Sequence, residues 1–457
     1  MMEEEALNAR TPPHNLDAER SVLGALLLDP IRVAEVAESV GPDDFFSPKN
    51  GIVFSTLLSL AEASAPIDFV SVGEALAATN NFQKVGGRAY LVELASSVTS
   101  SAHLKHHLKI VAETSVLRRL IGESTEILGE AFETRPDGEA VRELIDRSEN
   151  RIFQIANRDG AQGAAPISSA IEEAFKRIDS SSHRSGLTGL PTGYLDLDEL
   201  LCGLNAGELI ILAARPAMGK TALALNIIDY AASHQPEWLE RKPSVLLFSL
   251  EMGKQSLVSR MLCARARVDA HKLRTGRIPA EDYSGLAQAA GELSSTNVFI
   301  DDTPGLTAMG VRSRARRVKQ KHGLDLVVVD YLQLMSSPKA ESRQQEISVI
   351  SRSLKDLARE LEIPVIALSQ LSRAVESRDD KRPQLSDLRE SGSIEQDADI
   401  VLLLYRPEYY NPTDENQGVA EVICAKQRNG PTGTARLQFF GSVMRFENRA
   451  PSMGEAF

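Results

Sequence analysis

The clearest chemistry in this chain is at residues 214–221, which read A-R-P-A-M-G-K-T. They follow the apolar run Leu209–Ala213 and lead into the helical pattern Thr221–Asn226. This arrangement binds nucleotide triphosphates, because N–H groups at the helix start point at the phosphates, the lysine reaches the β and γ oxygens, and the hydroxyl faces Mg²⁺. The strict motif begins with Gly where this chain has Ala214, whose small side chain still allows close approach. The predicted nucleotide-binding residues are Arg215, Pro216, Ala217, Met218, Gly219, Lys220, Thr221 and Ala222.

Hydrolysis of a bound triphosphate needs a carboxylate near Mg²⁺, a group that orients water, and positive charge where the leaving phosphate becomes more negative. Three polar residues follow apolar runs with strand patterns, at the sheet edge where open α/β proteins bind ligands. Asp330 is predicted to lie beside Thr221 and the metal, Glu251 to act as general base, and Gln370 to sense the γ-phosphate. The residues leave simpler interpretations open: a solvated strand end, a capping or ion-paired glutamate, and a loop amide.

Two cations follow the apolar run Ala420–Ala425, in the sequence K-Q-R-N-G-P. Lys426 and Arg428 are separated by one residue, so in a strand their side chains share a face. Such a pair could reach a phosphate on another subunit. The residues alone favour a solvated basic strand end.

The charge of the chain is unevenly distributed. The 457 residues have a formal net charge of −12, which at first sight disfavours nucleic acid as a partner. Residues 1–162 hold 15 Lys and Arg against 25 Asp and Glu (−10), whereas residues 163–457 hold 36 against 38 (−2). Local basic clusters in the second part can therefore still hold a phosphate backbone. One cluster spreads around a predicted helix, which favours a solvated or interface face over a DNA-binding patch. Its members are Arg312, Arg314, Arg316, Arg317, Lys319 and Lys321.

Composition argues against several classes of protein. No apolar run approaches the ~20 residues that span a bilayer, so no membrane partner is expected. The N-terminus, M-M-E-E-E, lacks the basic-then-apolar order of a signal peptide. The three cysteines are widely spaced and in no metal-ligand pattern, which fits a reducing cytoplasm and argues against a zinc site.

The chain divides into regions of different texture. The first third has helical spacing and ends in two amphipathic stretches, 101–134 and 137–158, whose short connection predicts an antiparallel hairpin. That hairpin packs within its own domain or forms an oligomer contact. A flexible linker at 159–166 precedes a short amphipathic helix at about 167–180, which is expected to dock on its own chain or on a neighbour. The predicted domains are a helical N-terminal domain (1–158), a linker with a docking helix (159–188) and an α/β domain (189–457).

From about residue 189, strand and helix patterns alternate, which predicts an α/β fold with a largely parallel sheet and a closing β-hairpin. The predicted strands are Leu209–Ala213, Val245–Leu250, Val298–Asp301, Leu326–Asp330, Val365–Ser369, Ile400–Tyr405, Ala420–Ala425, Ala435–Phe440 and Met444–Asn448.

Segments along nearly the whole chain resemble the DnaB-type bacterial replicative DNA helicases, in which alanine at the position of Ala214 is usual. The matching segments are Pro12–Glu19, Ser21–Gly24, Gly193–Asp198, Ala214–Thr221, Ser249–Met252, Asp330–Met335, Ser369–Arg373, Asp387–Asp399 and Lys426–Gly430.

The resemblance implies a RecA-like ATPase motor domain, an all-α N-terminal collar, and a linker helix that docks on the adjacent motor of a ring-shaped homohexamer. It implies ATP and Mg²⁺ as cofactors, and single-stranded DNA, forked duplex, primase and a helicase loader as partners in a primosome. A cytoplasmic, nucleoid-associated location in a bacterium and movement from 5′ to 3′ also come from the resemblance.

The resemblance also implies roles for individual residues. Arg428, with Lys426, would be a finger that reaches a neighbour's γ-phosphate, which reverses the interpretation from the residues alone. A loop containing Arg389, Glu390 and Gly392 would hold single-stranded DNA in the central channel. Arg389 can contact a phosphate and Gly392 lets the backbone approach, so this binding would not depend on base sequence.

The resulting prediction is an ATP-hydrolysing helicase that translocates on single-stranded DNA and unwinds duplex at the replication fork. The alternative is a RecA-like DNA-dependent ATPase that binds DNA without unwinding it, and a third is a nucleotide-binding scaffold without turnover. The acidic N-terminal domain favours the helicase, because a collar followed by a linker helix suits a ring with a platform for partners.

Overall fold

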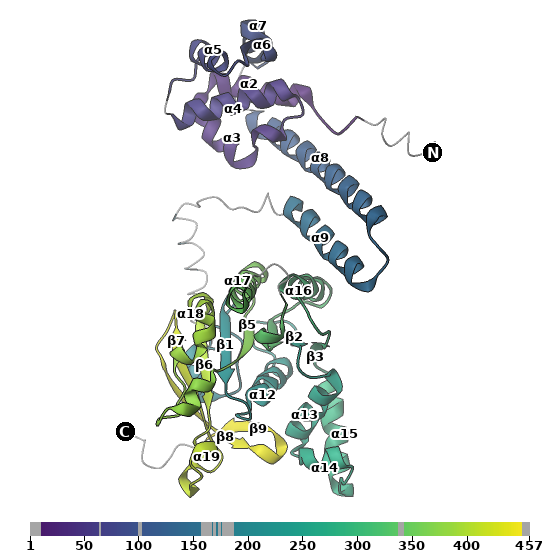
Figure 1. The fold of residues 1–457 in the computed structure, drawn as a ribbon, viewed down its shortest axis with the longest axis vertical. Coiled ribbons are helices and arrows are strands. Elements are labelled where there is room, and N and C mark those ends of the chain that lie inside the picture. The colour runs from purple at the N-terminus through teal and green to yellow at the C-terminus, as the bar shows by residue number, and fades with distance from the viewer. Residues whose placement is uncertain are drawn as a thin grey trace. The chain divides into compact units, whose positions relative to one another are not determined.

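The computed structural model describes residues 11–63, 65–98, 103–156, 167, 171, 175, 187–336 and 342–449. Its contacts divide the chain into two compact units, Met1–Ala170 and Ile171–Phe457, which are considered separately (Figure 1). The predicted linker, 159–166, lies outside the described residues, as does the predicted domain boundary at residue 158. None of the described helices is long and apolar enough to cross a membrane.

The described part of the first unit is helical, with a core built from the inward faces of its first helices. Asn15 caps the first helix by accepting a hydrogen bond from the N–H of Ala18 at 2.9 Å. Leu23 and Phe54 are fully buried in this core. The elements are α2 (Leu16–Leu28), η1 (Pro30–Arg32), α3 (Val33–Ser39), η2 (Pro42–Asp44), α4 (Pro48–Glu62), α5 (Phe69–Ala78), α6 (Phe82–Val85), α7 (Gly87–Ser96), α8 (Leu104–Glu133) and α9 (Gly138–Ala156).

The last two helices of the first unit, α8 and α9, pack against each other. Arg151 on α9 donates to Glu130 on α8 at 2.6 Å and lies 3.6 Å from Glu126. Several apolar side chains of this pair are at least 38% exposed, far more than a packed core would leave. They are Leu117, Leu120, Ile121, Leu128, Phe132, Val141, Ile145 and Ile152.

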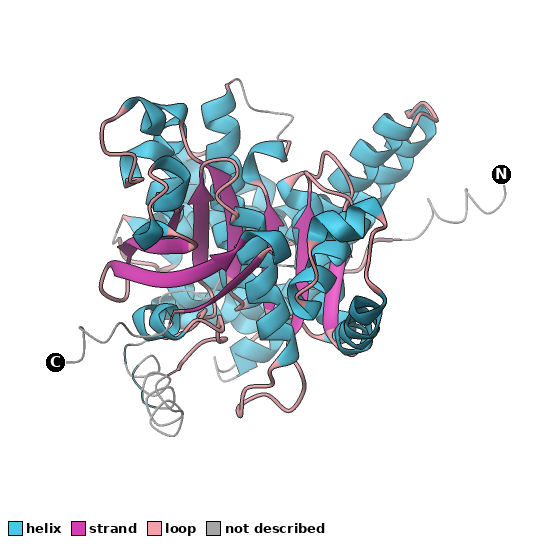
Figure 2. Ribbon diagram, turned by 90° about the horizontal axis from the view of Figure 1, so that it is seen from below, coloured by secondary structure: helices cyan, strands magenta, loops and turns pink. Residues whose placement is uncertain are grey.

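The second unit is built on a nine-stranded sheet in the order β3-β2-β4-β5-β1-β6-β7-β8-β9 (Figure 2). The strands from β3 to β6 in that order are parallel, and β7, β8 and β9 continue antiparallel. The predicted α/β fold with a largely parallel sheet is confirmed. The strands are β1 (Leu209–Ala214), β2 (Ser244–Ser249), β3 (Asn297–Asp301), β4 (Leu326–Asp330), β5 (Val365–Gln370), β6 (Ile400–Tyr405), β7 (Val419–Gln427), β8 (Gly433–Phe440) and β9 (Arg445–Asn448).

Helices cover both faces of this sheet, so β1, β2 and β4 are buried on both sides, as their unbroken apolar sequences require. Along β1, Ile210 packs with α12 on one face, and its neighbour Ile211 packs with α16 and α17 on the other. The helical elements are α11 (Leu195–Leu201), α12 (Lys220–Ser233), α13 (Lys254–Ala266), α14 (Ala270–Thr275), α15 (Ala280–Ser294), α16 (Ala308–His322), η5 (Leu332–Leu334), α17 (Arg343–Leu361), η6 (Arg373–Ser377), η7 (Leu385–Ser391), α18 (Gly392–Asp397), α19 (Pro407–Tyr410), η8 (Asp414–Asn416) and η9 (Gly441–Val443).

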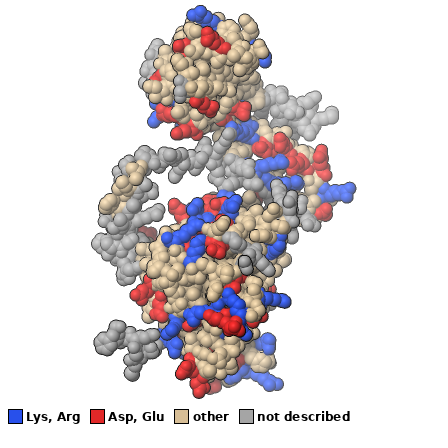
Figure 3. All heavy atoms as spheres, turned by 60° about the vertical axis from the view of Figure 1, so that its left-hand side comes forward, with Lys and Arg blue, Asp and Glu red and all other residues tan. Residues whose placement is uncertain are grey.

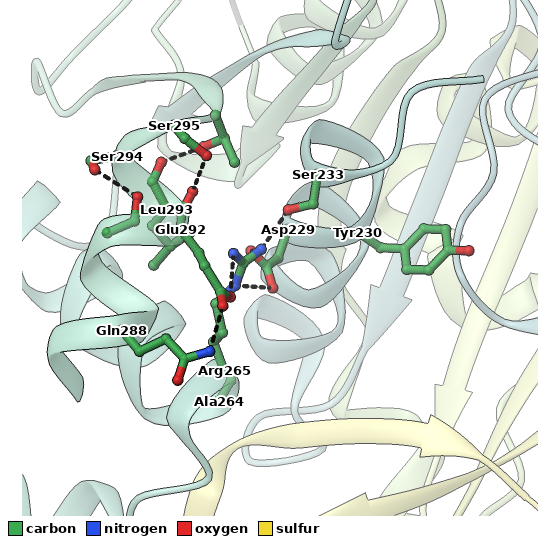
Figure 4. Close-up of polar contacts among 12 residues, drawn as sticks. Asp229, Tyr230, Ser233, Ala264, Arg265, Gln288, Glu292, Leu293, Ser294 and Ser295 are labelled. Carbon is green, nitrogen blue, oxygen red and sulfur yellow. Dashed lines mark hydrogen bonds and ion pairs between the residues drawn. The ribbon is translucent and has the colours of Figure 1, made fainter. Parts of the chain in front are cut away.

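One arginine fastens α13 to two other helices (Figure 4). Arg265 on α13 donates to Asp229 on α12 at 2.6 Å and also contacts Ser233 there. On its other side it lies 3.2 Å from Glu292 on α15. The guanidinium is only 14% exposed, and its fork satisfies several acceptors at once, so α13 is held in one place beside α12.

Candidate nucleotide-binding site

The loop between β1 and α12 contains two residues with left-handed backbone angles, which give it a tight bend. Ala217 and Gly219 have φ angles of 67° and 95°, in the left-handed region. A Cβ at Gly219 would also lie 3.0 Å from the ring of Phe446, so this position suits only glycine. Met218 is 1% exposed and anchors the loop in the core rather than facing solvent. The loop therefore presents the start of α12 to a pocket.

A pocket of about 570 Å³ opens at this loop and collects most of the predicted nucleotide site. Seven of the eight predicted nucleotide-binding residues line it, and so do Glu251 and Gln370 from the ends of β2 and β5. Met218, buried beneath the loop, does not line it. The lining residues are Ala214, Arg215, Pro216, Ala217, Gly219, Lys220, Thr221, Ala222, Glu251, Arg260, Tyr331, Gln370, Arg406, Phe439, Gly441 and Met444.

Asp330 lies directly behind Thr221, at the end of β4. The Thr221 hydroxyl donates to Oδ2 of Asp330 at 2.8 Å, and the Lys220 ammonium is 3.9 Å from Oδ1. That Oδ1 atom is buried without a hydrogen-bond partner among the described residues. A carboxylate oxygen left without a donor beside a threonine hydroxyl fits a magnesium ion, which prefers oxygen ligands.

Burial dominates the electrostatics of this pair. It raises the pKa of Asp330, which Lys220 and the Thr221 hydrogen bond oppose. It lowers the pKa of Lys220, which the charges of Asp330 and Glu251 oppose. Because the two groups are close and of opposite charge, each stabilises the charged form of the other.

The pocket also contains lining residues that the sequence does not predict as part of the site, among them Tyr331, Arg406 and Arg260. The ring of Tyr331 lies 4.6 Å from the Lys220 ammonium, as in a cation–π contact. Arg406 stacks over the ring of Phe439 and donates to the carbonyl of Ala217 at 3.3 Å. Tyr331 and Arg406 directly follow strands. The same reasoning that assigned Glu251 to the ligand-binding edge of the sheet, from its place after an apolar strand, therefore applies to them. Arg260 lies inside α13, where no local pattern marks it.

Lys426 and Arg428 lie at the other edge of the sheet. Gln427 pairs with Ile400, which is level with Ile210 near the start of β1. At about 3.3 Å per residue, the loop after β1 begins roughly 13 Å further along. Within one chain, therefore, this cation pair is not brought to the nucleotide pocket.

Both cations are engaged at the end of α18. Lys426 donates to the carbonyls of Glu395 and Ala398 at 2.5 and 2.7 Å. Arg428 donates to the carbonyl of Gln396 at 2.6 Å and to Asp399 at 3.3 Å. Carbonyls at a helix C-terminus carry partial negative charge, so they suit cations. Burial and the neighbouring Arg428 lower the pKa of Lys426.

The segment predicted to bind DNA spans the junction of η7 and α18. Its backbone is helical on both sides of Ser391, but the side chains of Arg389, Glu390 and Gly392 lie outside the described residues. The adjoining residues are anchored on α17, where Ser348 contacts Ser393 at 2.8 Å.

The basic helix α16 makes contacts within its own unit. Arg312 and Arg316 both contact Glu360 on α17, and Arg314 contacts Asp301 at the end of β3. Among the described residues in the view of Figure 3, positive and negative side chains are interspersed over the second unit. This agrees with the interpretation that α16 is not a dedicated DNA-binding patch.

Known proteins resemble this chain over nearly its whole length. The DnaB-like helicase C-terminal domain matches residues 189–448 and the DnaB-like helicase N-terminal domain matches residues 11–113. The chain is 45% identical to the replicative DNA helicase DnaC of Bacillus subtilis (97% of this chain, 96% of the relative) and 45% identical to the replicative DNA helicase DnaB of Geobacillus stearothermophilus (99% and 98%). A solved structure of a DnaB-like replicative helicase, described with its interactions with primase, superposes with a TM-score of 0.75 at 36% identity, covering 95% of this chain and 100% of that one. The chain belongs to the DnaB-like helicase family.

Proposed function

We propose that this protein is an ATP-hydrolysing replicative DNA helicase that moves along single-stranded DNA and separates the strands of a fork. The observation that carries the proposal is that Lys220, Thr221, Glu251 and Gln370 line one pocket while Asp330 accepts a hydrogen bond from Thr221, in a chain whose relatives are replicative DNA helicases over nearly their full length. A nucleotide-binding scaffold would not need a carboxylate and an amide at the γ-phosphate end of the site.

Each group has a distinct task in this proposal. The N–H groups at the start of α12 and the Lys220 ammonium hold the β- and γ-phosphates. Thr221 and Asp330 would hold Mg²⁺, which supplies charge neutralisation on the phosphate oxygens when bound. Glu251, exposed at the pocket rim, would orient and deprotonate the attacking water, and Gln370 would contact the γ-phosphate.

Completion of the site by a second subunit is supported by the position of the cation pair. Arg428 and Lys426 lie at the sheet edge opposite to the pocket of their own chain, so the pocket they can serve belongs to a neighbour. In a ring of identical subunits each chain then offers a pocket to one neighbour and a finger to the other. Reaching a γ-phosphate would exchange the carbonyl partners of Arg428 and Lys426 for phosphate oxygens. We propose a homohexamer on this basis and on the family.

Single-stranded DNA is proposed to contact the segment 389–392 by its phosphates. The buried residues Leu388 and Ile394 on either side of this segment belong to the core beneath α17, which would make it a firmly based contact. Movement from 5′ to 3′ is proposed from the family resemblance.

The first unit and the linker are proposed to assemble the ring. Residues 1–158 would form the collar, residues 159–188 the linker and residues 189–457 the motor. The exposed apolar side chains of α8 and α9 support an oligomer contact by this hairpin. Ile167, Ile171 and Phe175 are helical, exposed and spaced by four residues, which supports docking of their apolar stripe on an adjacent motor. Primase is a proposed partner because the similar solved structure is described with one, and a helicase loader is proposed from the family alone.

The deciding experiment is ATP-dependent strand displacement on a labelled fork. Substrates with both single-stranded tails, with only the 5′ tail and with only the 3′ tail are compared, using wild-type protein and Glu251→Gln as the variant that binds but does not hydrolyse ATP. We expect displacement that requires the 5′ tail and ATP, and none with Glu251→Gln. DNA-stimulated hydrolysis without displacement, on a fork and with a loader supplied, would favour the RecA-like DNA-dependent ATPase instead.

A further inference from the structure

The strands that bear Asp330 and Gln370 part just before these residues. The β4–β5 ladder pairs Val327 with Val365 and ends at Val329 with Ala367. On its other side β5 stays paired with β1 to its last residue, where Leu371 donates to the carbonyl of Ala214 at 3.1 Å. The end of β5 is therefore held by backbone contacts on the β1 side only, and Asp330 and Gln370 both lie beyond the last paired residues of β4 and β5.

The side chain of Gln333 bridges this gap. Gln333 lies on η5, three residues after Asp330. Its Nε2 donates to the hydroxyl of Ser369 at 2.9 Å, and its Oε1 accepts from the N–H of Gln370 at 3.4 Å. One amide thus contacts two successive residues of β5, in place of the missing ladder bonds.

Gln333 is itself fixed in place. Its neighbour on η5, Leu332, is 1% exposed and lies in the core, and Met335 just beyond is buried to the same degree. The carbonyl of Gln333 accepts a hydrogen bond from Arg343, the first residue of α17. The bridge therefore has a firm base on the β4 side.

Gln370 has space behind it as well as in front. It lines the nucleotide pocket and also a second cavity of about 360 Å³, whose lining includes Gln333 and Ser369. Because the end of β5 has no paired strand on one side and lies between two cavities, the side chain of Gln370 has space for more than one orientation. Among the described contacts on that side, the hydrogen bond from the N–H of Gln370 to Gln333 is the one that can fix the position of Gln370.

We propose that Gln333 is a positioning residue that holds Gln370 at the γ-phosphate end of the nucleotide pocket. The inference rests on the proposed function, because it takes Gln370 as the group that contacts the γ-phosphate. Gln333 itself does not line the nucleotide pocket, so its effect on hydrolysis would pass through Gln370.

The test is steady-state ATP hydrolysis by the full-length chain with saturating single-stranded DNA. Gln333→Met keeps the length of the side chain and removes both hydrogen bonds. We expect kcat to fall about tenfold while KM for ATP changes less than about twofold, because a misplaced contact to the reacting phosphate affects the transition state more than substrate binding. Gln344→Ala, which alters an exposed glutamine on α17, is the control and should match the wild type.

A double-mutant cycle separates this role from a general loss of structure. If Gln333 acts through Gln370, the double variant Gln333→Met, Gln370→Ala will be no slower than Gln370→Ala alone. Multiplied effects in the double variant would overturn the proposal. Should Gln333→Met not form folded rings, Ser369→Ala removes only the Nε2 contact and is expected to lower kcat about threefold; an unchanged kcat would equally overturn the proposal.

Failure of the inference can be told apart from failure of the proposed function. If Gln370→Ala hydrolyses ATP like the wild type, the γ-phosphate role of Gln370 is wrong, and the positioning role of Gln333 is overturned with it. If Gln370→Ala is impaired but Gln333→Met matches Gln344→Ala, the positioning role alone is wrong.

Discussion

The two edges of the central sheet hold their charged groups in different ways. At the edge with the loop between β1 and α12, Lys220 and Thr221 line an open pocket and contact the buried Asp330. At the opposite edge, Lys426 and Arg428 already have carbonyl partners at the end of α18. The first edge presents its charged groups to an open pocket, whereas the second holds cations that already have partners and would exchange them in the proposed finger role.

The largest expected effect comes from removing the cation of the pocket edge. Lys220→Ala should reduce ATP hydrolysis to background, because the β- and γ-phosphates lose their ammonium partner. Phosphate release is the measurement, with circular dichroism and sedimentation to show intact fold and assembly. Lys321→Ala, an exposed lysine on α16, should behave as the wild type. Hydrolysis retained by Lys220→Ala would remove the pocket from the mechanism.

Arg428→Ala tests the opposite edge. We expect hydrolysis to fall about 1000-fold, since an arginine that stabilises the transferring phosphate has effects of this size, with nucleotide binding and ring formation intact. Mixed rings of Arg428→Ala and Lys220→Ala subunits should recover part of the activity, because some intact pockets then meet intact fingers. Monomeric Arg428→Ala protein, or no recovery on mixing, would contradict a finger that acts on a neighbour.

Asp330→Asn sharpens the account of the pocket edge. The amide can keep the contact with Thr221 but carries no charge for a metal, so we expect about 100-fold slower hydrolysis. The magnesium concentration that gives half-maximal hydrolysis should also rise in Asp330→Asn. Chelation of magnesium should reduce hydrolysis by the wild type to background. A titration curve identical to that of the wild type would show that Asp330 does not hold the metal.

Lys426→Ala asks whether both cations of the second edge matter equally. Lys426 is held by two carbonyls and lies closer to the core, so we expect a smaller loss of hydrolysis, about tenfold, with DNA binding retained. Hydrolysis rates across an ATP titration give the answer. A loss as large as that of Arg428→Ala would mean that the pair acts as one unit.

The smallest effect is expected away from both edges. Arg312→Ala breaks an ion pair with Glu360 on the surface of the second unit, and affinity for single-stranded DNA should change less than about twofold. Fluorescence anisotropy with labelled oligonucleotide measures it. A large loss of affinity would make α16 a DNA-binding face after all.

The sequence predicts the pocket edge well for a simple physical reason. Parallel strands end at one edge, so a polar residue directly after an apolar run can be assigned to that edge without knowing strand order. Glu251, Asp330 and Gln370 follow this rule, and so do Tyr331 and Arg406. The side chain of Met218 is buried beneath the loop, because the same motif must also anchor itself in the core, and this burial is not apparent from the motif alone.

Other parts of the site depend on information that short patterns lack. Arg260 comes from the middle of α13, and its place depends on how Arg265 fastens that helix to α12 and α15. The partners of Lys426 and Arg428 are backbone carbonyls about thirty residues away in the chain, and a carbonyl has no sequence signature. The bridge made by Gln333 likewise appears only when strand order and ladder length are known.

The pocket and the cation pair lie at opposite ends of the same sheet, so if Arg428 is the proposed finger, no chain can sense its own bound triphosphate with its own Arg428. In a closed ring, each hydrolysis event would then affect the neighbouring subunit on one side only, so the coupling would run around the ring in a single direction. Opening one interface would deprive one pocket of its neighbour's Arg428 and leave the other pockets complete. A ring opened for loading onto DNA would therefore stop hydrolysing ATP at the open interface. The order in which subunits hydrolyse ATP would then follow from the arrangement of the subunits, without a separate regulatory element.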